Sequence, residues 1–193
     1  MYERLSIWRY PEPVLRRKAA AVLFDGSESA DKPIDLAALA RRMGELIVEH
    51  NGVGLAAPQV GKGIRLFVVN MTIEPGKEKV YINPELSALQ GQTEAEEGCL
   101  SIPGVNVLIR RAEELVIRAR DLNGKAFEEK AEGLLARVWQ HETDHLNGRL
   151  ILDYMNEESR LINRRAVQQL QEEYEKRTGR PRAGARSGRR SRT

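Results

Sequence analysis

The sequence contains a single cysteine, Cys99, which excludes an intramolecular disulfide. A lone thiol is typical of proteins in a reducing compartment, where it stays free. The first residues lack the charged and apolar regions of a secretory signal. No apolar run approaches the roughly 18 residues that a membrane-spanning helix needs. These absences predict a cytoplasmic protein without a membrane segment.

Positive charge is unevenly distributed along the 193 residues, whose formal net charge is +3. Residues 177–193 contain seven arginines and no acidic residue, so the rest of the chain is mildly acidic. The final segment is otherwise rich in glycine and serine, a composition that does not support a packed core. We therefore expect one folded domain over residues 1–176 and a basic, disordered tail over residues 177–193.

The spacing of apolar residues predicts an α+β fold with largely antiparallel strands. Three- and four-residue spacing predicts helices over residues 35–50, 131–146 and 156–176. Runs of β-branched residues predict strands over residues 64–69, 79–82, 105–109, 114–120 and 126–130.

Glycine, proline and asparagine predict where these elements end. Asn51-Gly52 should end the first helix, because glycine tolerates the left-handed C-cap conformation, and Asn83-Pro84 should end the strand that begins at residue 79. Asn123-Gly124 predicts a tight hairpin turn. Residues 25–33 are rich in Gly, Ser and Asp and predict a loop.

Two histidines one helical turn apart are the sharpest chemical signal. They belong to His141-Glu142-Thr143-Asp144-His145, inside the predicted helix over 131–146. Residues i and i+4 of a helix share a face, so both imidazoles can bind one metal ion. Glu142 would then be close enough to act as general base on a water molecule. A catalytic metal usually has three protein ligands, so a third must lie elsewhere in the chain.

The residues alone leave the third ligand open. An HExxHxxGxxH pattern would require a histidine where Ile151 stands. Cys99 is the better candidate, because it sits between a glycine and an Ile-Pro-Gly turn and its thiolate donates more charge than a carboxylate. Other zinc peptidases use a downstream glutamate, and this chain has several: Glu157, Glu158, Glu172, Glu173 and Glu175.

A glycine-rich segment over residues 52–61 lacks the Gly-Lys-Ser/Thr ending of a phosphate-binding loop. It also lacks the glycine spacing of a dinucleotide-binding turn. Two interpretations remain. In the first, the segment only connects a helix to a strand. In the second, it lets a substrate backbone approach closely, with Gln59 offering an amide N–H to a carbonyl oxygen.

Together these segments resemble the peptide deformylases. The three motifs of that family occur in order as Gly52-Val53-Gly54-Leu55-Ala56-Ala57-Pro58-Gln59, Glu97-Gly98-Cys99-Leu100-Ser101 and Gln140-His141-Glu142-Thr143-Asp144-His145-Leu146. The resemblance covers roughly residues 5–175. It implies curved antiparallel sheets around a central helix that carries HExxH, plus a C-terminal helix. The implied reaction removes the N-formyl group from the formylmethionine of nascent polypeptides and releases formate.

The resemblance also implies a role for each site residue. The metal ligands would be Cys99, His141 and His145, and the ion would be Fe²⁺ in function, with Zn²⁺, Ni²⁺ or Co²⁺ able to replace it. Glu142 would be the general base, while the Gln59 side chain and the backbone N–H of Leu100 would stabilise the oxyanion. The expected substrate-binding residues are Gly54, Val53, Gly98, Glu97, Ile102 and Val138.

One position departs from part of the family. Some bacterial members carry an arginine seven residues after the metal cysteine, near the incoming peptide, and this chain has Asn106 there. Arg110 and Arg111 follow and are candidates to replace it.

The expected partners are N-formylmethionyl peptides and, through the 156–176 helix and the basic tail, the ribosome. No membrane or specific DNA partner is expected. Two alternative functions stay open. One is a zincin-type metallopeptidase with a downstream glutamate ligand. The other is a non-catalytic, metal-stapled ribosome- or RNA-binding module, in which His50 would have to supply a fourth ligand.

Overall fold

The computed structural model describes residues 2, 4–24 and 34–179. The loop predicted over residues 25–33 and residues 180–193 of the predicted tail lie outside this range. The helices are η1 (Pro13–Arg16), α1 (Leu36–Glu49), η2 (Ala57–Val60), α2 (Gly133–Leu146), η3 (Ile151–Tyr154) and α3 (Glu157–Thr178), where η denotes a 3-10 helix. The strands are β1 (Gly54–Ala56), β2 (Leu66–Val69), β3 (Lys79–Gln90), β4 (Thr93–Glu97), β5 (Val107–Arg111), β6 (Glu114–Arg120) and β7 (Ala126–Glu132).

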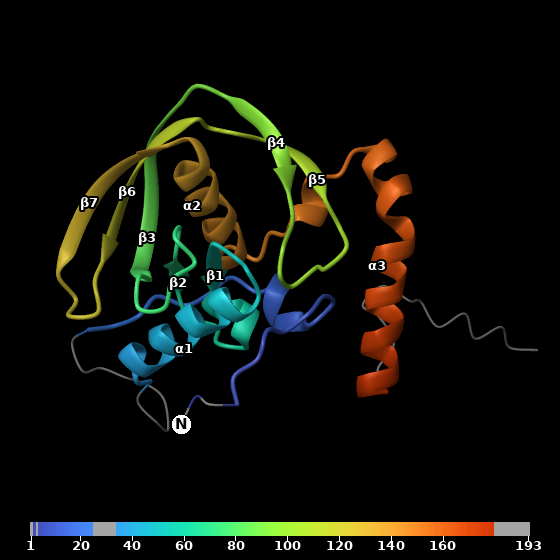
Figure 1. Ribbon diagram of the computed structural model, residues 1–193, viewed down its shortest axis with the longest axis horizontal. Coiled ribbons are helices and arrows are strands. Elements are labelled where there is room, and N and C mark those ends of the chain that lie inside the picture. Colours follow the sequence, from blue (N-terminus) through green and yellow to red (C-terminus); the bar gives the residue numbers. More distant parts are fainter. Residues whose placement is uncertain (1, 3, 25–33, 180–193) are drawn as a thin grey trace, which may run out of the picture.

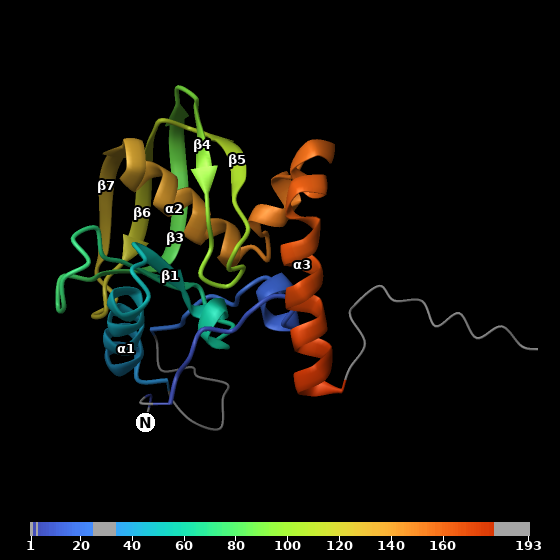
Figure 2. The same ribbon diagram turned by 45° about the vertical axis from the view of Figure 1, so that its right-hand side comes forward.

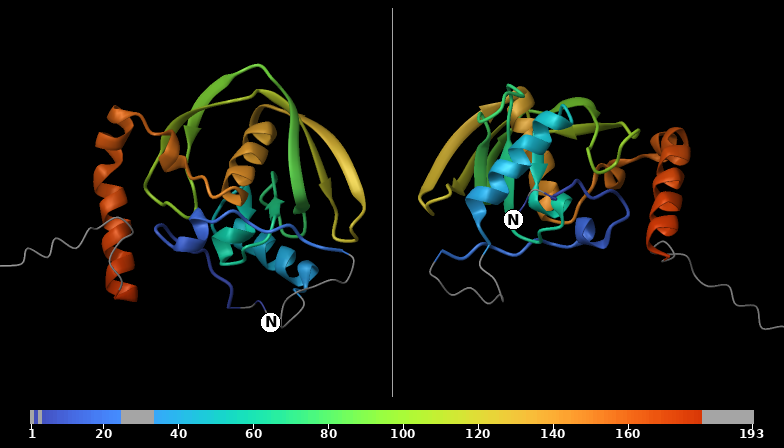
Figure 3. Two further views of the ribbon diagram at one scale, coloured as in Figure 1. Left: turned by 180° about the vertical axis from the view of Figure 1, so that it is seen from behind. Right: turned by 60° about the horizontal axis from the view of Figure 1, so that its bottom comes forward.

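Two antiparallel sheets surround α2. The larger has the order β1-β2-β3-β6-β7, and the smaller consists of β4 paired with β5. Figures 1 and 3 show α2 between the curved strands of both sheets, while α1 crosses below β1 and β2. The α+β, largely antiparallel fold predicted from the sequence is confirmed. None of the helices within the described residues has the length and hydrophobicity to span a bilayer.

Apolar side chains form one cluster on each side of the larger sheet. Between this sheet and α2, the Tyr81 ring stacks on Phe67 at 4.9 Å and meets Trp139 edge-on at 5.5 Å. On the other side, Leu39, Met43 and Ile47 of α1 pack against β1 and β2. Alternate strand residues therefore reach different clusters, which fixes the register of β2. Helix α2, which carries the predicted metal ligands, is held in place by this packing.

A third cluster joins the two ends of the described chain. Leu170 of α3 packs with Leu15 of η1 and with Ile102 and Val105, which precede β5. Figure 2 shows α3 upright beside the segment that contains η1, on the side of the molecule opposite β7. We call residues 6–12, which run to this cluster past η2, the N-terminal arm.

The structure corrects several predicted boundaries. Asn83-Pro84 does not end a strand, because β3 continues to Gln90 with a register shift between Ile82 and Glu85. Asn83 adopts the left-handed conformation with φ of 51°. Its side chain accepts a hydrogen bond from Val22 N and donates one to Val22 O, each 2.9 Å long. Proline lacks an N–H, and this irregularity is where a strand tolerates it.

The helix boundaries shift for similar local reasons. Asn51, not Gly52, takes the left-handed position after α1, with φ of 53°. Helix α2 begins at Gly133 because residues 131 and 132 complete β7. Helix α3 extends to Thr178, and Gly179 caps it with φ of 66°. Residues 177 and 178 of the predicted tail are therefore helical.

Candidate metal centre

The three predicted metal ligands lie together. Helix α2 presents His141 and His145 on one face, and Cys99 follows β4 in the turn that leads toward β5. The Cys99 Sγ lies 3.3 Å from His145 Nε2. One ligand atom from each of the three residues falls within 4.8 Å of the others. Cys99, the favoured candidate for the third ligand, thus lies next to both histidines.

The donor set fits a divalent cation with an open position. Tetrahedral bonds of 2.0–2.3 Å place ligand atoms about 3.5 Å apart, close to the Cys99–His145 separation. Burial lowers the pKa of His145 well below its usual value, which keeps the ring in its neutral, metal-binding form. Burial also acts to lower the pKa of His141, but hydrogen bonds to Cys99 and Glu97 raise it. Metal binding displaces protons from its ligands, so a bound cation would take the place of the proton that this raised pKa favours on His141.

The alternative ligands are not in this cluster. Within residues 2, 4–24 and 34–179, the group of Cys, His, Asp and Glu close enough to hold one ion is Cys99, His141 and His145 alone. The glutamates considered as zincin ligands lie on α3, and His50 is the exposed C-cap of α1. The structure therefore offers three ligands, as a catalytic site requires, rather than the four of a closed zinc site.

A buried network of ion pairs and hydrogen bonds holds His141 in place. Glu97 Oε2 accepts a 2.9 Å hydrogen bond from His141 Nδ1, which leaves Nε2 for the metal. Arg111 binds both Glu97 oxygens at 2.9 Å, and Arg137 binds Oε1 at 2.7 Å. Burial acts to raise the pKa of Glu97, but Arg111 and His141 lower it well below the usual range. The Glu97 carboxylate therefore stays ionised where it contacts His141.

The same network also contacts a second residue of α2, Asp144. Arg111 donates a 2.6 Å hydrogen bond to Asp144 Oδ2, which also accepts a 2.7 Å bond from the Tyr154 hydroxyl. Sequence reasoning missed Arg137 and considered Arg111 only as a replacement for the arginine absent at Asn106. The alternation along β5, which places Arg111 on the buried face, is the one signal that indicated its role here. Arg111 is committed to this network, so it does not replace an arginine at the position of Asn106.

Glu142 lies beside the cluster without a partner for one of its oxygens. Its side chain is buried, and Oε2 makes no hydrogen bond to the described residues. Burial raises the pKa of its carboxyl to about 7. Its other oxygen lies 2.4 Å from where a Cβ on Gly54 would stand. Gly54 therefore lets strand β1 pass directly against the carboxylate.

Gln59 connects the glycine-rich segment to the cysteine segment. Its Oε1 accepts a 2.8 Å hydrogen bond from Ala56 N, which orients the amide. Its Nε2 donates to Ser101 Oγ at 3.2 Å and approaches Cys99 Sγ at 3.5 Å. An amide N–H thus points at the metal cluster from a fixed position.

A cavity of about 480 Å³ opens over these groups. Of the predicted substrate-binding residues, five line it: Val53, Gly54, Glu97, Gly98 and Val138. Ile102 does not contribute to this lining, because it is fully buried in the cluster beneath α3. Leu134 and Pro103 add apolar surface, and Arg9 of the N-terminal arm adds a cation. Sequence reasoning did not single out these three residues.

An open Cys/His₂ cluster on an HExxH helix, next to a partnerless carboxylate, places the chain among the metal-dependent hydrolases. Residues 4–161 match the family model described as polypeptide deformylase. The chain belongs to the peptide deformylase family.

Individual relatives extend over most of the chain. It is 46% identical to a peptide deformylase of Dictyoglomus turgidum, over 81% of this chain and 96% of the relative. It is 40% identical to a peptide deformylase of Alkalilimnicola ehrlichii, over 96% of this chain and 98% of the relative. The crystal structure of a plant peptide deformylase superposes with a TM-score of 0.84 at 36% identity, covering 94% of this chain and 96% of that one. The structure of a Plasmodium falciparum peptide deformylase superposes with a TM-score of 0.80 at 31% identity, covering 91% of this chain and 99% of that one.

Proposed function

We propose that this chain hydrolyses the formyl amide at the N-terminal formylmethionine of nascent polypeptides, releasing formate, in the cavity over Cys99, His141 and His145. Family membership supplies the reaction. The observation that carries its assignment to this cavity is the buried Glu142 carboxylate, which lies beside three metal-binding atoms and has one oxygen without a partner.

The residues around the cluster supply proton transfer and oxyanion binding. Bound at Cys99, His141 and His145, a divalent cation supplies Lewis acidity to the attacking water and the formyl carbonyl. Glu142 accepts the proton of the water and delivers it to the leaving amine. The Gln59 amide and the backbone N–H of Leu100 donate hydrogen bonds to the developing oxyanion. The hydrogen bond from Ala56 N to Gln59 Oε1, which orients the Gln59 amide, supports this role.

The strand edges beside the cavity fit an extended peptide. Among the described residues, β1 is an outer strand of the larger sheet and β4 pairs with β5 alone. Each strand thus has an edge with no strand partner, and Gly54 and Glu97 place these edges at the cavity. A peptide can pair with them through its backbone. The methionine side chain then contacts Val138, Leu134 and Leu100, which belong to the apolar part of the lining.

We propose Fe²⁺ as the working metal, as expected from the family. A Cys/His₂ set accepts Fe²⁺, Zn²⁺, Ni²⁺ and Co²⁺, so geometry alone does not select among them. A thiolate ligand supports a reducing, cytoplasmic location, because oxidation would remove it. Metal analysis of protein purified without oxygen tests the identity of the ion. Zinc as the main metal in such a preparation would contradict the assignment.

The decisive experiment measures formate release from formyl-Met-Ala-Ser by protein loaded with Fe²⁺ without oxygen, or with Ni²⁺. Glu142→Ala should lose several orders of magnitude in kcat and keep its metal, because only the base is removed. Turnover by the variant at the normal rate would overturn the role of Glu142. Absence of turnover by the folded, metal-loaded wild type would overturn the substrate.

A ribosome contact through α3 is a second proposal. Its exposed surface combines Arg160, Arg164 and Arg165 with Leu161 and Ile162, each of the last two 72% exposed. Basic groups attract the ribosomal RNA backbone in a salt-dependent way. Co-sedimentation with ribosomes should weaken in Arg164→Glu and Arg165→Glu and in a chain truncated after Gly179. Unchanged co-sedimentation of all three would exclude the contact.

A further inference from the structure

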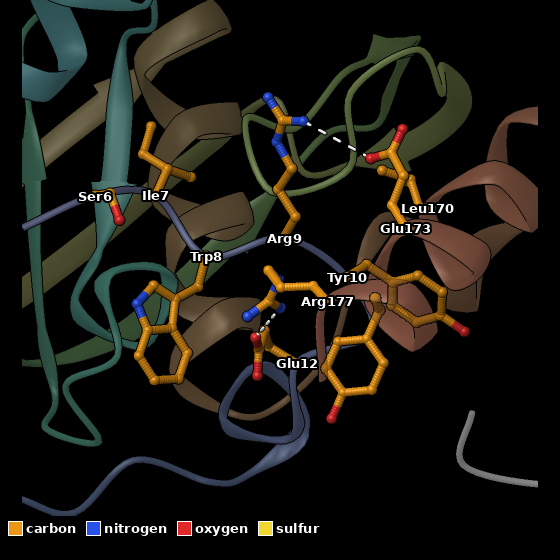
Figure 4. A pocket seen from close by; sticks show the side chains of 10 residues that line it. Ser6, Ile7, Trp8, Arg9, Tyr10, Glu12, Leu170, Glu173 and Arg177 are labelled. Carbon is orange, nitrogen blue, oxygen red and sulfur yellow. Dashed lines mark hydrogen bonds and ion pairs between the residues drawn. The ribbon is translucent and has the colours of Figure 1, made fainter. Parts of the chain in front are cut away.

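Arg9 lines two neighbouring cavities. It contributes to the cavity over the metal cluster and to a second cavity of about 460 Å³ between the N-terminal arm and α3. Figure 4 shows the second cavity, with Arg9 directed toward Glu173 and Trp8 turned the other way. A peptide that extends out of the site toward α3 therefore passes Arg9.

Hydrogen bonds on both sides of Arg9 hold its backbone against the site. The N–H of Trp8 donates to Gln59 O at 2.7 Å, and the N–H of Tyr10 donates to Ser101 O at 2.9 Å. Gln59 and Ser101 are themselves joined by a 3.2 Å side-chain hydrogen bond. The arm is thus fixed to the segments that carry the oxyanion donor and the metal cysteine. The position of Arg9 at the cavity does not depend on its own side chain.

The guanidinium of Arg9 remains available to a ligand. It lies 4.0 Å from Glu173 Oε2, and the two side chains are 59% and 49% exposed. The other arginine in the lining of the metal cavity, Arg137, is 8% exposed and is committed to Glu97, Ile109 O and Thr93 O. An exposed ion pair at such a separation is weak, so a substrate carboxylate can replace Glu173.

We propose that Arg9 is a specificity-determining residue that recognises a carboxylate in the substrate downstream of formylmethionine, and that Glu173 of α3 competes for it. The inference rests on the proposed function of the cavity. The carboxylate can come from an Asp or Glu side chain or from the C-terminus of a short peptide, which is the same chemistry. Glu96, an exposed acid in the lining, counters a general attraction of anions and makes the preference local.

The test compares KM and kcat for matched peptides at low salt. Formyl-Met-Ala-Asp-amide against formyl-Met-Ala-Asn-amide isolates a side-chain carboxylate, and formyl-Met-Ala-Ser against its amide isolates a terminal one. For the preferred source we expect a KM about two- to fivefold lower than for the neutral partner, with kcat unchanged. The ratio should approach one at high salt, because exposed charges are screened.

Variants identify the cation responsible. Arg9→Gln should abolish the preference, Arg9→Lys should retain part of it, and Glu173→Gln should enlarge it by removing the competitor. Arg4→Gln is the matched control, since it removes the same charge from an exposed residue that lines neither cavity. Arg4→Gln should keep the wild-type ratio.

A preference that survives in Arg9→Gln, or a wild type without any preference, would overturn the inference. Turnover of the neutral amides distinguishes failure of the inference about Arg9 from failure of the proposed function. If the wild type turns over the neutral peptides without discriminating against them, only the role of Arg9 fails. If it turns over none of the peptides, the proposed function fails first.

Discussion

Glu97 and His141 face each other across a hydrogen bond of 2.9 Å that joins Glu97 Oε2 to His141 Nδ1. The bond fixes which ring nitrogen carries the proton. Because Arg111 and Arg137 hold the same carboxylate, the orientation of a metal ligand depends on charges buried deeper in the fold.

Replacing Glu97 with glutamine should weaken metal binding about 10- to 100-fold, because the neutral amide no longer supports His141. The free energy of unfolding should fall by about 3 kcal/mol, since the buried guanidinium of Arg137 loses its counter-ion and that of Arg111 keeps only Asp144. Chelator competition and urea unfolding measure the two effects. Unaltered metal affinity in the folded variant would show that the hydrogen bond does not orient the ligand.

Cys99→Ala should lose the bound metal and keep the fold, because the cysteine is only half-buried. Metal content after dialysis, together with circular dichroism, measures both. Glu172→Gln is the control, because it removes one of the α3 carboxylates considered as ligands and should retain one metal ion per chain. Retention of the metal by Cys99→Ala would revive the zincin interpretation.

Gly54→Ala should lower kcat about 100-fold, because the new Cβ would come within 2.4 Å of Glu142 Oε1 and displace the base. Gly63→Ala is the matched control, since a Cβ there meets no atom within 4 Å. Kinetics of formate release compare the two variants. Equal rates for both would mean that the position of Glu142 tolerates such a shift.

Gly148→Ala should destabilise the fold more than Gly179→Ala. Both glycines have left-handed backbones, with φ of 74° and 66°, so each alanine costs about 1–2 kcal/mol of strain. At Gly148 the Cβ would also lie 2.6 Å from Arg16 O, whereas at Gly179 it meets nothing within 4 Å. Urea unfolding should show an additional loss of at least about 1 kcal/mol for Gly148→Ala. Equal losses would mean that η1 moves away freely.

Local patterns were sufficient for the helices, for most strands and for the motifs. The strand over residues 114–120 and the helix spacing of His141 and His145 follow from periodicity within a few residues. Strand β4 was missed because its sequence, Thr-Glu-Ala-Glu-Glu, is mostly acidic. Its pairing with β5 and the burial of Glu97 against two arginines arise only in three dimensions.

The same reason explains the errors at single residues. Ile102 is adjacent in sequence to the cysteine motif, but the turn after Cys99 directs it into the cluster beneath α3. Arg9 lies 90 positions from Cys99, and no local pattern connects the two. Its place at the cavity depends on hydrogen bonds between the N-terminal arm and two distant segments.

The cluster beneath α3 ties an early part of the chain to a late one, since Leu15 packs with Leu170. During synthesis the arm leaves the ribosome first and must wait for α3 before this cluster can close. The arm also forms hydrogen bonds with Gln59 and Ser101, so one segment contributes both to this cluster and to the wall of the cavity. Each copy would therefore have its cavity wall fully supported only after its own α3 has left the ribosome.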